Sequence, residues 1–219
     1  MGFAEARERM VTDQIAGRGV RDPRVLAAMR AVPREAFVDA NQRHRAYEDH
    51  PLPIGHGQTI SQPYIVARMC ELLALRGGER VLEIGAGCGY QTAVLAALAQ
   101  AVWGVEIVPE LTDRANRNLK TLGIANARVE CFDGTAGWPE HAPYDGIVVA
   151  AGAPRVPVML LAQLADGGRL VIPVGPREDQ VLLTVTRRGD DYETTREAPV
   201  RFVDLVGRYG WGGSGPGQA

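Results

Sequence analysis

The sequence predicts an α/β fold, in which a doubly wound, mostly parallel seven-stranded sheet follows N-terminal helices and ends in an antiparallel strand pair. Short apolar runs typical of buried strands alternate along the chain with longer segments of helical character, the pattern of parallel β–α–β units. The run from Val81 to Ile84 also leads directly into three alternate glycines and an apolar helical stretch. That layout is typical of a nucleotide-binding strand–turn–helix unit.

Length and composition are those of an ordinary globular protein. The 219 residues suit one domain with or without an appendage, and 46% of them are hydrophobic. The net charge of −2 and the pI of about 6.1 argue against a nucleic-acid partner. No apolar run approaches the roughly 18 residues that span a bilayer. Three cysteines without metal-ligand spacing predict no metal site and a cytoplasmic location.

The first 57 residues are predicted to form a helical and loop extension packed on the core. Residues 5–16 have the pattern of a charged amphipathic helix. Asp22 supplies an N-cap and Pro23 a first-turn proline for a second helix. Residues 39–57 are polar, and their histidines lack metal-ligand spacing, so a long loop is expected there.

Residues 58–207 are predicted to form the core, and the glycine-rich residues 208–219 a flexible tail. The turn-rich stretch between 174 and 181 has no room for a helix, so the strands that it joins should be antiparallel. The predicted elements are a helix over 63–73 ended by Gly77 and Gly78, a strand over 81–84, a helix from 93, a strand over 102–105, a helix over 109–122, strands over 127–131 and 145–151, a helix over 156–164, and strands over 169–174, 181–186 and 200–206.

The glycine turn predicts a nucleoside site. Three alternate glycines starting at Gly85 allow positive φ and a close ligand approach, but Tyr90 breaks the dinucleotide pattern G-x-G-x-x-G. Glu106 ends the second strand 21 residues after Gly85, where an acid accepts hydrogen bonds from ribose hydroxyls. Glu83 disfavours a phosphate and suits a cationic ligand. A turn without a ligand and an NAD site are the alternatives.

Two further positions are ambiguous from composition alone. Ser61 precedes the helix opened by Pro63, near the mouth of the sheet, and a helix N-cap is its simplest role. Asp133 follows the third strand and is either a ligand contact or part of a plain Asp-Gly turn with Gly134.

The run E-x-G-x-G-x-G with its later acid resembles motif I of class I S-adenosylmethionine methyltransferases. Within that class, four segments resemble the protein-L-isoaspartate (D-aspartate) O-methyltransferase family, and the likeness extends over about residues 8 to 207. The T-I-S-Q-P run is specific to this family within the class. These segments are Gly57–Pro63, Val81–Ala93, Pro143–Val149 and Val200–Gly207.

The resemblance implies a Rossmann-like methyltransferase fold with S-adenosyl-L-methionine as cofactor and S-adenosyl-L-homocysteine as product. It implies methyl transfer to the free α-carboxylate of L-isoaspartyl residues in damaged proteins and peptides, which starts their repair to aspartyl. These proteins and peptides are the expected partners of a cytoplasmic monomer that binds neither nucleic acid nor membrane. A small-molecule carboxyl or hydroxyl O-methyltransferase and an inactive binding module are the alternatives.

The resemblance also assigns roles to residues. It makes Ser61 the catalytic residue, a donor that orients the acceptor carboxylate, and it places Asp133 beside the adenine. Asp204 stands where the family usually has proline, which we expect to alter loop stiffness and not activity. The expected cofactor-binding residues are Glu83, Ile84, Gly85, Ala86, Gly87, Cys88, Gly89, Glu106, Ile107, Asp133 and Gly134. The expected substrate-binding residues are Gln58, Thr59, Ile60, Ser61, Leu205 and Val206.

Overall fold

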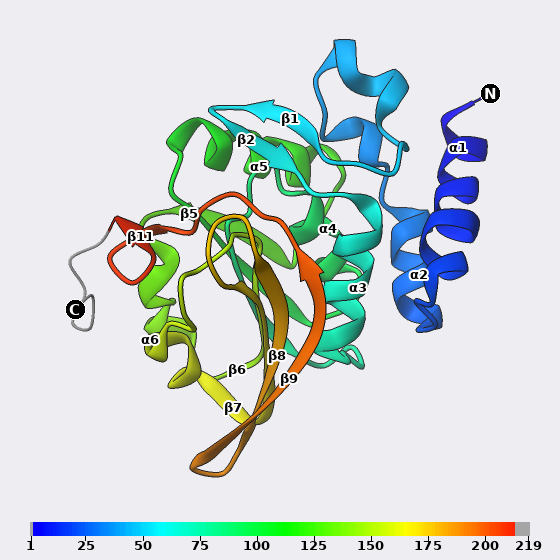
Figure 1. Cartoon of the computed structure of the whole chain (residues 1–219). Coiled ribbons are helices and arrows are strands. Elements are labelled where there is room, and N and C mark those ends of the chain that lie inside the picture. Colours follow the sequence, from blue (N-terminus) through cyan, green and yellow to red (C-terminus); the bar gives the residue numbers. More distant parts are fainter. Residues whose placement is uncertain (1, 213–219) are drawn as a thin grey trace.

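A seven-stranded sheet forms the centre of the computed structural model, which describes residues 2–212 (Figure 1). Its strand order is β5-β4-β3-β6-β7-β8-β9. The first five strands in that order are parallel, and β8 and β9 are each antiparallel to the preceding strand, which confirms the predicted fold class. The strands are β3 Arg80–Ile84, β4 Ala101–Glu106, β5 Ala127–Cys131, β6 Tyr144–Val149, β7 Leu164–Val174, β8 Gln180–Arg188 and β9 Asp191–Val200.

Each face of the sheet carries its own apolar core, because successive side chains of a strand point to opposite faces. Val81 packs with one cluster and its neighbour Leu82 with the other. The Val81 cluster includes residues of α3 Pro63–Leu73, α4 Tyr90–Ala96 and α5 Pro109–Thr121. The Leu82 cluster is covered by Trp138 and by the short α6 Val158–Leu161.

The N-terminal helices form a further layer beside α3 (Figure 1). Helix α1 Phe3–Arg9 continues as a π-helical turn, Met10–Ile15, and a 3₁₀ turn, Ala16–Arg18. Helix α2 Pro23–Ala31 begins as expected, because the Asp22 side chain accepts a hydrogen bond from the Arg24 N–H at 2.8 Å.

The polar stretch predicted as a loop contains a 3₁₀ segment, Ala40–Arg45, and the first strand of a hairpin. In this hairpin β1 Leu52–Gly55 pairs antiparallel with β2 Gln58–Ile60. Its turn depends on positive φ at Gly55, His56 and Gly57. The sequence did not reveal it because each strand is only three or four residues long.

The last strand of the sheet lies earlier in the chain than predicted. The expected strand over 200–206 is absent, and β9 occupies Asp191–Val200 instead. The first six residues of β9 are exposed, so this edge strand carries no apolar alternation that would mark it. Helix α6 is also shorter than the predicted 156–164. Helix α3 ends at Leu73 as predicted, but its C-cap is Ala74, with φ 53°, and not one of the expected glycines.

The chain after β9 folds back toward the carboxyl ends of the parallel strands. Residues 201–205 form no regular strand beyond one bridge between Asp204 and Gly152. Short strands β10 Val206–Gly207 and β11 Trp211–Gly212 then pair with each other. The first five residues of the predicted flexible tail, 208–212, therefore have a defined structure, and its remaining residues lie outside those described.

Among residues 2–212, no helix combines the length and the apolar character that crossing a bilayer requires. In the same part of the chain, no group of three or more His, Cys, Asp or Glu side chains is arranged to hold a metal ion.

Candidate active site

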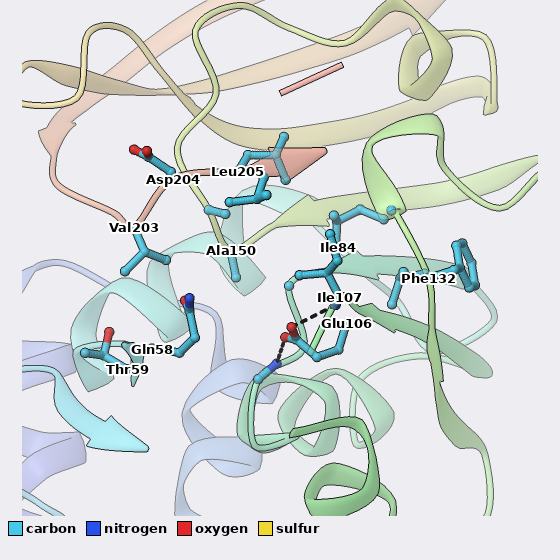
Figure 2. A pocket seen from close by; sticks show the side chains of 16 residues that line it. Gln58, Thr59, Ile84, Glu106, Ile107, Phe132, Ala150, Val203, Asp204 and Leu205 are labelled. Atoms are coloured by element: carbon cyan, nitrogen blue, oxygen red, sulfur yellow. Dashed lines mark hydrogen bonds between the residues drawn. The ribbon is translucent and has the colours of Figure 1, made fainter. Parts of the chain in front are cut away.

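A pocket lies at the carboxyl ends of the parallel strands. This is the edge at which open α/β sheets bind ligands. Ile84 of β3 and Glu106 of β4 face Val203, Asp204 and Leu205 across it (Figure 2). The lining residues are Gln58, Thr59, Ile84, Gly85, Gly87, Val105, Glu106, Ile107, Phe132, Gly134, Ala150, Ala151, Val203, Asp204, Leu205 and Val206.

The Glu106 carboxylate is held in place by backbone donors (Figure 2). Oε2 accepts from Gly87 N at 2.8 Å, and Oε1 accepts from Ile107 N at 2.8 Å and Val108 N at 2.9 Å. The side chain is 6% exposed and has no cationic partner among the described residues. A carboxylate fixed in this way at a strand end is suited to accept hydrogen bonds from a ribose diol.

The three alternate glycines serve different purposes. All three have positive φ: 83° at Gly85, 56° at Gly87 and 85° at Gly89. Gly87 lines the pocket, and a Cβ there would lie 3.2 Å from Ile54 Cδ1. A Cβ at Gly89 would instead lie 3.1 Å from Ala115 Cβ, so that glycine lets α4 approach α5. Only the first two glycines shape the ligand space.

Glu83 is fully buried behind the glycine turn. Its Oε2 accepts from the Thr92 hydroxyl, while Oε1 has no partner. Burial raises the pKa of Glu83 to about 7, the Thr92 hydrogen bond opposes this shift, and the negative charge of Glu106 adds to it.

A small cavity separates Glu83 from Thr59 and Ser61. Gln91, whose Nε2 also has no partner, lines it as well. An unpaired carboxylate oxygen and an unpaired amide N–H are costly when buried, so this cavity suits a small polar group of a ligand. An ammonium group is the most favourable partner for the Glu83 carboxylate.

Asp133 is directed toward the C-terminal segment. Its Oδ1 accepts from the Thr135 N–H at 2.9 Å and from the Thr135 hydroxyl at 2.7 Å, and Oδ2 accepts from the Arg208 N–H at 2.7 Å. Partial burial acts to raise the pKa of Asp133, but these hydrogen bonds outweigh it and the pKa is lowered. The neighbouring Phe132 and Gly134, and not Asp133, line the pocket.

A second, wider groove adjoins the pocket. Thr59 lines both spaces, and Ser61 lies in the groove beside it. The Ser61 hydroxyl makes no hydrogen bond to any described residue, and the N-cap of α3 is Gln62, so Ser61 is not a helix cap. The groove residues are Arg18, Pro51, Thr59, Ser61, Gln62, Tyr64, Ile65, Ala150, Ala198, Pro199, Val200, Arg201, Phe202 and Val203.

Comparison with known proteins identifies the family. The family model described as protein-L-isoaspartate(D-aspartate) O-methyltransferase matches residues 5–210. The chain belongs to this family. A protein-L-isoaspartate O-methyltransferase 1 from Rhodopseudomonas palustris is 58% identical over 98% of this chain and 88% of its own length. A protein-L-isoaspartate O-methyltransferase 2 from Pelobacter propionicus is 59% identical over 94% of this chain and 92% of its own.

Solved structures of family members have the same fold. One protein-L-isoaspartate O-methyltransferase has a TM-score of 0.85 and 32% identity over 93% of this chain and 67% of its own. A putative member from Plasmodium falciparum, solved in complex with S-adenosyl-L-homocysteine, has a TM-score of 0.78 and 27% identity over 91% of this chain and 98% of its own.

The residues expected from the family resemblance lie in three places. Pocket positions are Ile84, Gly85, Gly87, Glu106, Ile107, Gly134, Gln58, Thr59, Leu205 and Val206. Glu83, Ala86, Cys88, Ile60 and Ser61 line the small cavity behind the glycine turn, and Ser61 also lines the groove. Gly89 and Asp133 line none of these spaces. Leu205 and Val206, expected on the substrate side, therefore lie in the pocket.

Several lining residues were not expected from the sequence. Phe132 follows strand β5, and Ala150 and Ala151 follow strand β6. Their position directly after a predicted strand could have identified them as pocket residues. Val203 and Asp204 reach the pocket only because the chain folds back after β9. Arg18 reaches the groove from the N-terminal layer, and no local pattern marks it.

Proposed function

We propose that this protein transfers a methyl group from S-adenosyl-L-methionine to the free α-carboxylate of L-isoaspartyl residues in proteins and peptides. The observation that carries the proposal is a separation of charge between two adjoining spaces. The pocket and the small cavity are lined by three acids, Glu83, Glu106 and Asp204, and by no basic side chain. The groove is lined by Arg18 and Arg201 and by no acidic side chain, and Arg18 pairs with Asp49, which is not among the lining residues, at 3.1 Å. A cationic donor and an anionic acceptor suit these two spaces.

The chain's own residues fit the donor. Glu106 accepts hydrogen bonds from the ribose, and Gly85 and Gly87 leave room for a close approach of the ligand. Glu83 and Gln91, with their unpaired polar atoms, receive the amino-acid end. When bound, the cofactor supplies a methyl group on a sulfonium centre.

The acceptor requires no general base, because a carboxylate with a pKa near 4 is already ionised at neutral pH. The task of the protein is to align the two partners and to exclude water. Ser61 is free to donate a hydrogen bond to one carboxylate oxygen, since its hydroxyl has no other partner among the described residues. Thr59, shared by pocket and groove, marks the place where donor and acceptor meet.

The methyl ester made in this way can close to a succinimide that reopens in part to normal aspartate, which is the repair. The groove, with a cavity volume of about 740 Å³, is large enough for a peptide segment. We further propose that the protein acts as a monomer in the cytoplasm on proteins and peptides, without nucleic acid or membrane. Free Cys70, Cys88 and Cys131 support a reducing compartment, and the pI of about 6.1 supports the absence of nucleic acid.

The decisive experiment compares two peptides that differ only at one residue. Methyl transfer from labelled S-adenosyl-L-methionine is measured for an isoaspartyl peptide and for its aspartyl counterpart. We expect incorporation into the first alone, and base-labile label identifies the ester. Transfer only to small carboxylic acids would indicate a small-molecule methyltransferase, and cofactor binding without any transfer would indicate a binding module.

A further inference from the structure

The segment Val203–Val206 lies along one side of the cofactor pocket, and we call it the strap (Figure 2). Its backbone is tied to Gly152: Gly152 N donates to Val203 O at 2.7 Å, and Leu205 N donates to Gly152 O at 2.8 Å. All four residues of the strap line the pocket, and Val203 also lines the groove. A displacement of the strap would therefore open both spaces.

A cluster of three side chains holds the strap from outside the pocket. The Asp204 side chain points away from Glu106 in Figure 2, and its Oδ2 accepts from Arg177 Nε at 2.7 Å. The Arg177 guanidinium lies over the Trp211 ring, 4.3 Å from its centroid. Trp211 Nε1 donates to Gly152 O at 2.9 Å, the same oxygen that accepts from Leu205 N. We call Arg177, Asp204 and Trp211 the latch.

The latch joins two segments that the Gln180 side chain also connects: its Oε1 accepts from Phe202 N at 2.8 Å, and its Nε2 donates to Phe202 O at 3.3 Å and to Arg177 O at 3.4 Å. Arg177 belongs to the turn between β7 and β8, whereas Asp204 lies after β9 in a segment without regular strand pairing. Leu205 is buried in the core, and Trp211 N donates to Leu205 O at 2.7 Å, so the backbone of the strap is fixed there. The Asp204–Arg177 ion pair adds a side-chain tie from the strap to the β7–β8 turn. The Asp204 side chain is 32% exposed and that of Arg177 is 60% exposed, so salt can screen the pair.

We propose that Asp204 is a positioning residue that, paired with Arg177 and Trp211, holds the strap over the cofactor pocket and slows the exchange of cofactor and product. This proposal rests on the proposed function, which assigns the pocket to S-adenosyl-L-methionine. It differs from the expectation that Asp204 alters loop stiffness and not activity, and the experiment below decides between them.

The test measures how fast the product leaves. Protein loaded with radiolabelled S-adenosyl-L-homocysteine is chased with excess unlabelled compound, and the dissociation rate is followed by rapid filtration. We expect Arg177→Gln and Asp204→Asn each to raise this rate about three- to tenfold, the range for a partly exposed ion pair with a cation–π contact. The double variant should be no faster than the faster single one, because the two residues act through one interaction.

Two readouts separate positioning from a general loss of stability. In 1 M salt the wild-type rate should rise toward that of Arg177→Gln, whose own rate should change little. The KM for S-adenosyl-L-methionine should rise in both variants, while single-turnover methyl transfer at saturating cofactor stays within about twofold in Arg177→Gln, because Arg177 does not line the pocket. Arg188→Gln is the matched control, because it breaks another exposed ion pair, Arg188–Glu193 at 3.5 Å, on the β8–β9 hairpin.

Product dissociation at the wild-type rate in both folded single variants would overturn the latch while leaving the proposed function in place. An equal acceleration in Arg188→Gln would also overturn it, because the effect would then be unspecific. Failure of the wild-type protein to bind S-adenosyl-L-homocysteine would overturn both proposals. Arg177 lies on an exposed turn, so its variant remains informative if Asp204→Asn fails to fold.

Discussion

The cofactor pocket and the acceptor groove are built by different means. The pocket collects the ends of neighbouring strands of one sheet, and its central acid, Glu106, is fixed by three backbone N–H groups. The groove brings together Arg18, residues 59–65 and residues 198–203, and the hydroxyl of Ser61 has no fixed partner. The difference indicates that the pocket is preorganised, and we propose that the groove gains its contacts when a peptide binds.

The largest expected effect tests the pocket side of this comparison. At Gly87 a valine side chain would meet Ile54 and would strain a backbone with φ 56°. We expect Gly87→Val to weaken S-adenosyl-L-methionine binding by at least about a hundredfold, measured by titration calorimetry. Gly123→Val is the matched control, because Gly123 has φ 69° and open space around its Cβ position. Equal affinity in the folded Gly87 variant would remove the turn from the site.

Glu83 allows a second test, because its burial links the pocket to pH. Its pKa of about 7 stands above the reference value of 4.5, so the folded state retains a proton that the unfolded state has lost between these pH values. The free energy of unfolding therefore falls as pH rises through that window. Relative to Glu83→Gln, the free energy of unfolding of the wild-type protein should fall by about 3 kcal/mol across this window.

This loss is measured without cofactor, by urea unfolding of both proteins at several pH values. The difference between the two stabilities should be flat below about pH 4 and above about pH 8, where both states carry the same charge at position 83. Parallel stability curves across the whole range would show that Glu83 is ionised in the folded protein at acidic pH.

Glu106→Ala should have a smaller effect, confined to the cofactor. Losing charge-assisted hydrogen bonds to the ribose is expected to lower affinity for S-adenosyl-L-methionine about tenfold to a hundredfold in calorimetry. Glu110→Ala is the control, because Glu110 is an exposed acid in the first turn of α5 and lines neither the pocket nor the groove. Unchanged affinity in the Glu106 variant would exclude this residue from ribose binding.

Ser61→Ala tests the acceptor side alone. Loss of one hydrogen bond to a charged group should lower kcat/KM for an isoaspartyl peptide about tenfold to a hundredfold. Cofactor affinity should change much less than kcat/KM, because Ser61 borders only the small cavity and not the main pocket, and the unfolding midpoint should stay close to the wild-type value, because Ser61 does not cap α3. A methylated Ser61 that forms and decays at the rate of turnover would contradict the orienting role and require a two-step mechanism.

The sequence predicted the elements that local patterns encode, and it did not predict those that depend on the tertiary fold. Helix α3 and strand β5 have the bounds expected at 63–73 and 127–131, because local apolar periodicity and flanking breakers mark both. The pocket could also be predicted from a local pattern, because the strand–turn–helix geometry fixes the spacing between the glycines and the acid at the end of the next strand. Strand β9, exposed on both faces, and the pairing of Arg177 with Asp204 depend on the tertiary fold, which no local pattern encodes.

The hydrogen bonds on Asp133 have a consequence for the protein's own lifetime. Among aspartates, those followed by glycine are the most open to rearrangement, because the glycine nitrogen can attack the side-chain carboxyl without hindrance from a Cβ. Three such pairs occur here, beginning at Asp133, Asp145 and Asp166. Backbone N–H groups of Arg208, Arg80 and Gly189 bind the three carboxylates at 2.7, 2.8 and 2.8 Å. The fold thereby restrains each of these carboxylates from turning onto its own backbone, the step that begins the ageing which the enzyme is proposed to repair in others.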